Sequence, residues 1–168
     1  FHSETLCKDY GFKKLDNVLF VLNNILNEGI VDLNILATYP NADTGGELII
    51  KKLKTFSNIQ NEKVWLFPSL GHKLYLHALK KFDCLIGNSS SGIIEAPLVG
   101  IPVINIGNRQ KGRATFGEVL NIAGDKSDIN KSLTKILIES RASIGSPDFV
   151  YKKSPSKLII DFLIKKMI

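Results

Sequence analysis

The residues Gly87–Glu95, which read GNSSSGIIE, decide how this chain is expected to fold. They follow the short apolar run 84–86 and open a helical pattern over 92–99. A buried strand, a glycine-bounded loop and a helix in this order are typical of a parallel α/β sheet. In such sheets ligands bind outside the carboxyl ends of the strands, so this loop is also the first place to look for a site.

The rest of the chain alternates in the same way. Expected strands cover 33–38, 64–67, 84–86, 102–106 and 119–122, and expected helices cover 14–28, 47–56, 73–81, 92–99 and 128–139. Strands that are continuously apolar indicate a parallel sheet covered by helices on both faces. The predicted fold is therefore a doubly wound, Rossmann-like α/β domain over 1–153. A separate helix with an apolar stripe is expected at 154–168, packed on this domain or on a neighbour.

Bulk composition bounds the class of protein. With 168 residues and 44% hydrophobic character, the chain can bury the core of one domain. The net charge is +6, but the basic residues are scattered, which favours a surface that tolerates an anionic ligand over a nucleic-acid binder. No apolar run approaches the roughly 18 residues that a membrane span needs. Two cysteines and three histidines form no disulfide framework or metal spacing, so we expect a cytoplasmic protein without metal or cofactor.

The sequence begins at Phe1-His2, without an initiator Met. We therefore expect that further polypeptide precedes it. A lone histidine such as His2 is more often structural than catalytic, and the same holds for His72 and His77.

The three serines at 89–91 have two readings. Backbone N–H groups and the positive dipole end at a helix N-terminus form an anion site, and hydroxyl groups add donors to phosphate oxygens. Serine is also a preferred helix N-cap, for which one residue suffices. Three serines between Gly87 and Gly92 favour phosphate binding.

Glu95 is expected about one turn inside the following helix, on the face of Ser91. A carboxylate repels phosphate but can accept hydrogen bonds from a ribose diol, as the acidic residue of dinucleotide folds does. The alternative is a favourable charge near a helix N-terminus. Pro97 should remove one helical hydrogen bond and kink this helix.

The loop after the expected strand at 102–106 carries Arg109, Lys111 and Arg113. Guanidinium groups donate paired hydrogen bonds to phosphate, which suits a diphosphate. An exposed basic turn is the alternative. The loop at 40–45 is a weaker signal: Asn41 can donate to a phosphate or a sugar, but Asn is common in turns.

Five stretches in chain order resemble UDP-N-acetylglucosamine 2-epimerases, and they look most like the hydrolysing branch that feeds sialic-acid-type sugar synthesis. They are Phe1–His2, Tyr39–Asp43, Gly87–Gly92, Glu95–Pro97 and Pro102–Arg113. The Gly-Asn-Ser-Ser and Arg-Gln-x-Gly-Arg elements are specific together, although each is weak alone.

The resemblance implies roles for individual residues. Ser89 and Ser90 match the diphosphate-binding serines of the family, and Glu95 matches its ribose ligand. Arg109 matches an arginine near the nucleotide. Arg113 is the last residue of the same element, and we assign it to the diphosphate as well.

Three further matches concern the cleft. His2 matches an active-site histidine that follows the linker from the first lobe, and Asn41 matches an asparagine that faces the cleft. The loop Leu70-Gly71-His72 falls where the family holds uracil, a looser match.

The resemblance also implies an architecture. Residues 1–153 would be the UDP-binding, C-terminal lobe of a two-lobed fold shared with nucleotide-sugar glycosyltransferases of the GT-B type. An N-terminal lobe outside this sequence would form the opposite wall of the cleft, and the helix at 154–168 would cross onto it. A homo-oligomer stays open.

The implied reaction starts from UDP-N-acetylglucosamine. UDP leaves as the proton at C2 is removed, and water then adds to give N-acetylmannosamine. Three alternatives stay open: a non-hydrolysing UDP-sugar 2-epimerase, a nucleotide-sugar glycosyltransferase lobe, and a UDP-sugar binding module without turnover.

Overall fold

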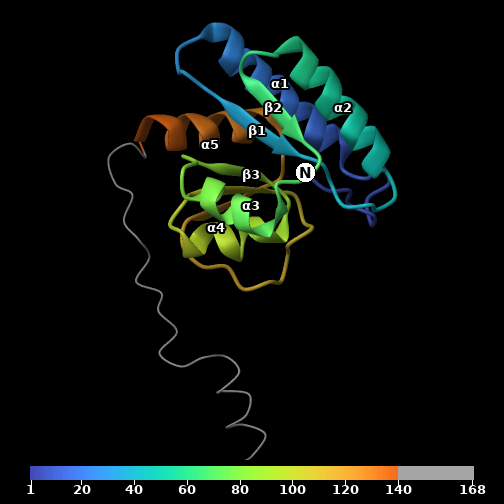
Figure 1. Ribbon diagram of the computed structural model, residues 1–168. Coiled ribbons are helices and arrows are strands. Elements are labelled where there is room, and N and C mark those ends of the chain that lie inside the picture. The colour runs from blue at the N-terminus through green and yellow to red at the C-terminus, as the bar shows by residue number, and fades with distance from the viewer. Residues whose placement is uncertain (140–168) are drawn as a thin grey trace, which may run out of the picture.

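A computed structural model describes residues 1–139, in which helices and strands alternate along the chain (Figure 1). The strands are β1 (Ile35–Thr38), β2 (Val64–Phe67), β3 (Leu85–Gly87), β4 (Val103–Ile106) and β5 (Val119–Ile122). The helices are α1 (Phe12–Glu28), α2 (Gly46–Ile59), α3 (Gly71–Leu79), α4 (Glu95–Leu98) and α5 (Lys126–Glu139), with a 3-10 turn η1 (Ser90–Gly92). The predicted helix at 154–168 and the boundary at 153 lie outside the described residues.

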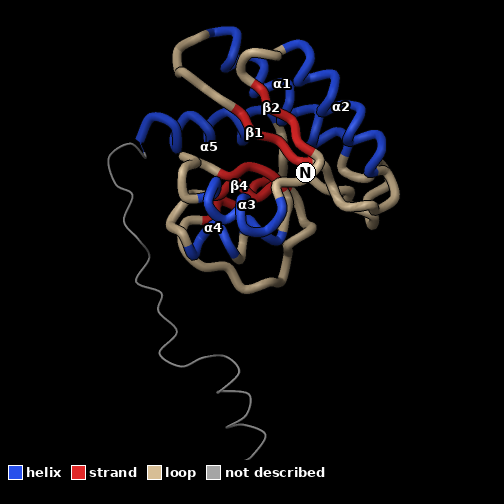
Figure 2. Tube along the Cα trace, viewed as in Figure 1, coloured by secondary structure: helices blue, strands red, loops and turns tan. Residues whose placement is uncertain are grey.

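Every strand pairing is parallel, as predicted, and the α/β fold class is confirmed. The strands form two hydrogen-bonded sheets rather than one: β1 pairs with β2, and β4 lies between β3 and β5. The two sheets lie one above the other in Figure 2, with the N-terminus between them at one end.

Helices cover both faces of the larger sheet. On one face Ile104 and Ile106 of β4 belong to a core cluster with Val18 of α1 and Ile129 of α5. On the other face Val103 packs with residues of α3 and α4, among them Leu79 and Ala96. Successive side chains of a strand point to opposite faces, which explains why neighbouring residues of β4 serve two different cores. Residues 103–106 are all buried.

Most predicted elements begin and end within a few residues of their expected bounds, but the single helix at 92–99 is wrong. The structure has η1 up to Gly92 and then the one-turn helix α4, which begins at Glu95. Pro97 has no N–H to donate, and its ring collides with the carbonyl four residues earlier, at Ile93. A continuous helix through this segment is therefore blocked.

Because the strands are parallel, the loops that follow them gather at one edge. The N-terminus lies at the same edge, beside the arrowhead of β1 (Figure 1). Within residues 1–139 no helix has the length and apolar character to cross a membrane.

Candidate functional site

Asn88, the residue after β3, is fully buried and fastens the first residues of the chain. Its side-chain Oδ1 accepts a hydrogen bond from the His2 main-chain N–H at 2.7 Å. Its Nδ2 donates to the His2 carbonyl oxygen at 2.8 Å. The amide therefore satisfies both main-chain groups of His2 and fixes that residue at the carboxyl edge of β3.

The main-chain carbonyl of Asn88 binds the loop that follows β4. It accepts from Arg109 Nη1 at 3.2 Å and from Gln110 Nε2 at 2.8 Å. The second Arg109 nitrogen, Nη2, lies 4.0 Å from Asp43 Oδ2 in the loop after β1. One buried residue thus joins three loops around a half-buried guanidinium group.

The His2 imidazole is held in one protonation state and one tautomer. Its Nδ1 accepts a hydrogen bond from the Asn41 main-chain N–H at 3.1 Å. Burial, the N-terminal ammonium and Arg109 lower the pKa of His2 to about 4, against an opposing effect of Asp43. The ring is therefore neutral near pH 7, and because Nδ1 accepts, the proton is carried by Nε2.

The serine loop at 89–91 begins a shorter helical segment than predicted. Ser89 is the N-cap of η1, and its Oγ accepts from the Ser91 N–H at 3.3 Å. The Ser91 hydroxyl is hydrogen-bonded to the Tyr75 hydroxyl. Because η1 and α4 are each about one turn long, little macrodipole is available to attract an anion. Anion binding here has to rest on hydroxyl groups and on Arg109.

Glu95 is the first residue of α4, not one turn inside a helix as predicted. Its Oε2 is buried and has no hydrogen-bond partner among residues 1–139. Burial raises the pKa of Tyr75, and the nearby Glu95 charge raises it further, against the Ser91 hydrogen bond. A buried carboxylate oxygen without a donor is costly, and a bound hydroxyl group would relieve that cost.

A cavity of about 500 Å³ adjoins these residues. Its lining includes six predicted site residues: His2, Asn41, Leu70, Gly71, His72 and Ser89. The lining also includes Tyr75, which the sequence did not single out. Pockets that bind small molecules are commonly of this size, with a few polar groups on an apolar wall.

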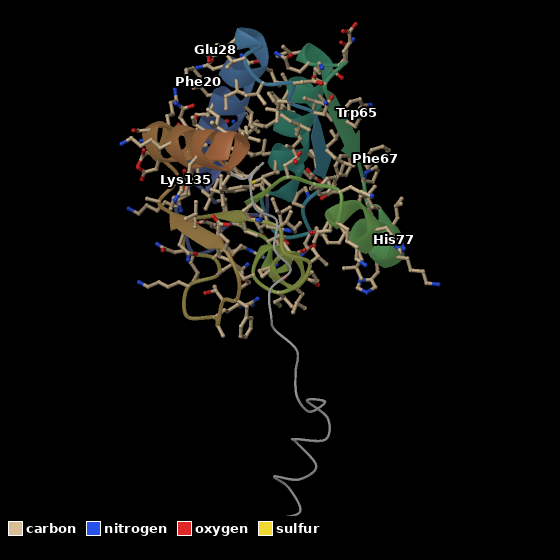
Figure 3. The ribbon with its side chains drawn as sticks, turned by 90° about the vertical axis from the view of Figure 1, so that its left-hand side faces the viewer. Phe20, Glu28, Trp65, Phe67, His77 and Lys135 are labelled. Carbon is tan, nitrogen blue, oxygen red and sulfur yellow. The ribbon has the colours of Figure 1, made fainter. Side chains whose placement is uncertain are left out.

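Four other predicted site residues are not part of the cavity lining: Ser90, Glu95, Arg109 and Arg113. Ser90 is half-buried within η1, and Arg113 is exposed at the far end of its loop. Figure 3 shows His77 of α3 projecting away from the protein, and its Nδ1 lies 2.8 Å from the Lys73 carbonyl oxygen. No group of three His, Cys, Asp or Glu side chains in the described part of the chain is arranged to hold a metal ion.

Sequence reasoning missed Asn88, Gln110 and Tyr75 as site residues. Asn88 carried the clearest available signal, because an amide placed directly after a buried strand needs several partners. Gln110 and Tyr75 gave none, since polar and aromatic residues are common in loops and on helices.

Comparison with known proteins gives a consistent result. The family model described as UDP-N-acetylglucosamine 2-epimerase matches residues 1–163. A UDP-N-acetylglucosamine 2-epimerase of Neisseria meningitidis serogroup B is 45% identical over 80 residues, which are 48% of this chain and 20% of that protein.

Two further relatives align over a larger share of the chain. The GDP/UDP-N,N'-diacetylbacillosamine 2-epimerase (hydrolyzing) of Campylobacter jejuni is 33% identical over 81% of this chain and 34% of its own length. The polysialic acid biosynthesis protein P7 of Escherichia coli is 35% identical over 79% of this chain and 32% of its own length. The chain thus spans about a third or less of the relatives that it matches.

Proposed function

Since the chain belongs to the UDP-N-acetylglucosamine 2-epimerase family, we propose that it is the UDP-binding lobe of a hydrolysing enzyme of this kind. The substrate proposed is UDP-N-acetylglucosamine, and the products are UDP and N-acetylmannosamine. Two relatives named as hydrolysing enzymes, which act on diacetylbacillosamine nucleotides, support the hydrolytic reaction.

One observation carries the proposal: a buried asparagine brings His2 and Arg109 together beside a cavity at the carboxyl edge of parallel strands. A guanidinium group in this position can hold a diphosphate and stabilise its negative charge as it departs. Ser89 and Ser90 would add hydroxyl donors, and Arg113 would contribute from the rim of the loop.

The ribose would lie on the other side of the serine loop. Glu95 Oε2, which is buried and has no donor among residues 1–139, would accept hydrogen bonds from the diol. The loop Leu70-Gly71-His72 would border the uracil, because it lines the same cavity after β2. Asn41 would face the sugar from the loop after β1.

The reaction needs a base at C2 and a path for the electrons. Loss of the C2 proton forms a C1–C2 double bond while the anomeric C–O bond breaks, and its electron pair leaves on UDP. Water then adds its hydroxyl group at C1 and a proton at C2 on the opposite face, which gives N-acetylmannosamine.

In this reaction His2 suits the role of a hydrogen-bond donor better than the role of the C2 base. Because its Nδ1 accepts from Asn41 and its ring is neutral, Nε2–H is a donor and not a base. We assign His2 to donating a hydrogen bond to the leaving oxygen or the sugar. The C2 base would come from the opposite wall of the cleft, in an N-terminal lobe of the same polypeptide. The helix at 154–168 would cross onto that lobe.

The full-length enzyme tests this proposal when it is incubated with UDP-N-acetylglucosamine and no acceptor. Release of UDP together with free N-acetylmannosamine, followed by NMR, is the expected result. Appearance of UDP-N-acetylmannosamine without free sugar would indicate a reversible epimerase instead. Turnover that requires an added acceptor would indicate a glycosyltransferase. No turnover with or without an acceptor would indicate a binding module.

A further inference from the structure

Glu4 is a buried acidic residue that the proposed reaction does not use. It comes two residues after His2, is 5% exposed and does not line the cavity. Its Oε2 accepts a hydrogen bond from Lys14 Nζ of α1 at 2.6 Å and another from the Cys7 thiol at 3.1 Å. Charged groups are seldom buried unless they are paired, and Lys14 provides the opposite charge here.

The other carboxylate oxygen of Glu4, Oε1, is buried and has no hydrogen-bond partner among residues 1–139. It lies against Gly107, the residue that follows β4. A buried oxygen without a donor costs free energy, so stability alone does not explain why the carboxylate is placed here. The explanation has to be sought in the loop that the carboxylate touches.

Gly107 shows how closely the Glu4–Lys14 ion pair approaches this loop. Its φ of 75° is in the left-handed region that favours glycine. A Cβ at this position would collide with Glu4 Oε1 and would stand 2.9 Å from Lys14 Nζ. Both charged groups therefore lie directly against the first residue of the loop 107–113.

The same loop carries Arg109 and is held at two other points. The Gly107 N–H donates to the Ile122 carbonyl oxygen of β5 at 2.9 Å. Two residues later, Arg109 Nη1 donates to the Asn88 carbonyl oxygen at 3.2 Å. The guanidinium group is thus carried by a loop whose first residue is fixed between β5 and the ion pair.

The ion pair is itself fixed to the body of the protein. The Glu4 main-chain N–H donates to the Tyr10 carbonyl oxygen at 3.0 Å, and the Glu4 carbonyl oxygen accepts from the Cys7 N–H at 2.8 Å. Lys14 belongs to α1, and the next residue, Leu15, is part of a core cluster. A support anchored in this way can hold the loop at one position, which a mobile surface charge cannot do.

We propose that Glu4 is a positioning residue of the UDP site: through its ion pair with Lys14 it holds Gly107, and thereby keeps Arg109 where it can bind the diphosphate. This inference rests on the proposed function. Side chains that bind a ligand have to be held close to their productive geometry by neighbours that do not touch the ligand. Glu4 acts in this way through the loop.

Calorimetric titration of the full-length enzyme with UDP tests the role of Glu4. Glu4→Gln keeps the size of the side chain but removes its charge, and it should weaken UDP binding about tenfold, as the loss of a group that orients a binding residue does. The matched control is Asp16→Asn, because Asp16 accepts from Lys52 at the same distance of 2.6 Å on the protein surface. This control should change UDP affinity by less than about twofold.

Both variants are titrated at a temperature at which thermal denaturation shows them to be folded. A UDP affinity of Glu4→Gln equal to that of the unchanged enzyme would overturn this inference alone, even if the variant is less stable. Failure of the unchanged enzyme to bind UDP would overturn the proposed function together with the inference.

A double-mutant cycle separates positioning of Arg109 from a general effect on the site. Because Glu4 acts through Arg109, Glu4→Gln should change UDP affinity by less than about twofold in an enzyme that already carries Arg109→Ala. The same loss in both backgrounds would overturn the proposal, since Glu4 would then act on another part of the site.

Two glycines of the loop give a second test, which also decides the question if Glu4→Gln does not fold. Gly107→Ala and Gly112→Ala both place a side chain at a positive φ, of 75° and 84°, but a Cβ at Gly112 meets nothing within 4 Å. Gly107→Ala displaces either the ion pair or the loop, so it should weaken UDP binding clearly more than Gly112→Ala does. Equal losses in the two variants would overturn the proposal.

Discussion

Strands β4 and β1 have similarly apolar sequences but differ in their surroundings. Residues 103–106 of β4 are all buried, with a strand on either side. Residues 35–38 of β1 are all half-buried and line the cavity, and within residues 1–139 they have one neighbouring strand. Apolar content alone therefore does not distinguish a central strand from a half-buried one, because burial depends on the strands and helices around each.

A second contrast separates the outer strand β2 from the segment that follows β3. The outer strand β2 exposes Trp65 and Phe67, which project from the body of the protein in Figure 3. The segment that follows β3 holds buried polar groups instead, among them Asn88 and an oxygen of Glu95. Buried polar groups are costly unless they are paired, so their concentration here supports the proposed site.

The largest expected effect compares matched substitutions in β4 and β1. In the full-length enzyme, Ile104→Ala should lower the free energy of unfolding by about 4 kcal/mol. Ile35→Ala should cost less, about 2 kcal/mol, because Ile35 packs against the same core but is only half-buried. Urea denaturation measures both. Equal losses for the two variants would contradict the argument that burial separates the two strands.

The next effect compares two buried asparagines. Asn88→Ala leaves the His2 N–H and carbonyl without partners, which should cost about 2 kcal/mol of stability and most of the UDP affinity. Asn105→Ala breaks a 2.7 Å hydrogen bond to Asn121 and should cost similar stability. In denaturation experiments the two variants should lose similar stability. In calorimetric titration with UDP only Asn88→Ala should lose affinity. Normal UDP affinity in Asn88→Ala would separate this asparagine from the site.

A smaller effect tests whether Glu95 binds ribose. Glu95→Gln should weaken UDP binding by about 1–2 kcal/mol, since a carboxylate accepts stronger hydrogen bonds than an amide. The loss should be less for 2′-deoxy-UDP, which lacks one of the two hydroxyl groups. Equal losses for the two ligands would assign Glu95 a structural role.

The smallest effect concerns the His2 imidazole. Its pKa of about 4 in the folded protein is below the ordinary value, so between pH 6.5 and 4 the unfolded chain binds more protons. Stability should therefore be full above pH 6.5 and fall as the pH falls through this window. An NMR titration of His2 in the 168-residue chain should show a midpoint near 4. A midpoint near 6.5 would remove the argument that His2 acts as a neutral donor.

The fold could be predicted from sequence because apolar runs report burial directly. The bounds of β2 and β5 were predicted to the residue, and α1 began two residues earlier than expected. The helix at 92–99 failed because the effect of Pro97 on the whole segment outweighed its apolar pattern. The two separate sheets could not be predicted, because apolar runs do not say which strands pair with one another.

The candidate site was predicted less completely. Residues that follow strands, such as Ser89 and Asn41, were placed at the correct edge because parallel strands end together. Asn88 was missed because its importance comes from contacts across 86 residues of sequence. Arg113 was grouped with Arg109 by charge alone, although four residues along a loop place it in solvent.

The most direct test of the UDP site compares two cations in one loop. Arg109 contacts Asn88 beside the cavity, whereas Lys111 is exposed two residues away. In calorimetric titration of the full-length enzyme with UDP, Arg109→Ala should weaken binding by about 2 kcal/mol, near the value of a hydrogen bond to a charged group. Lys111→Ala should change it by less than about 0.5 kcal/mol, since exposed charges are screened. Equal, small losses for both variants would contradict a diphosphate site at Arg109.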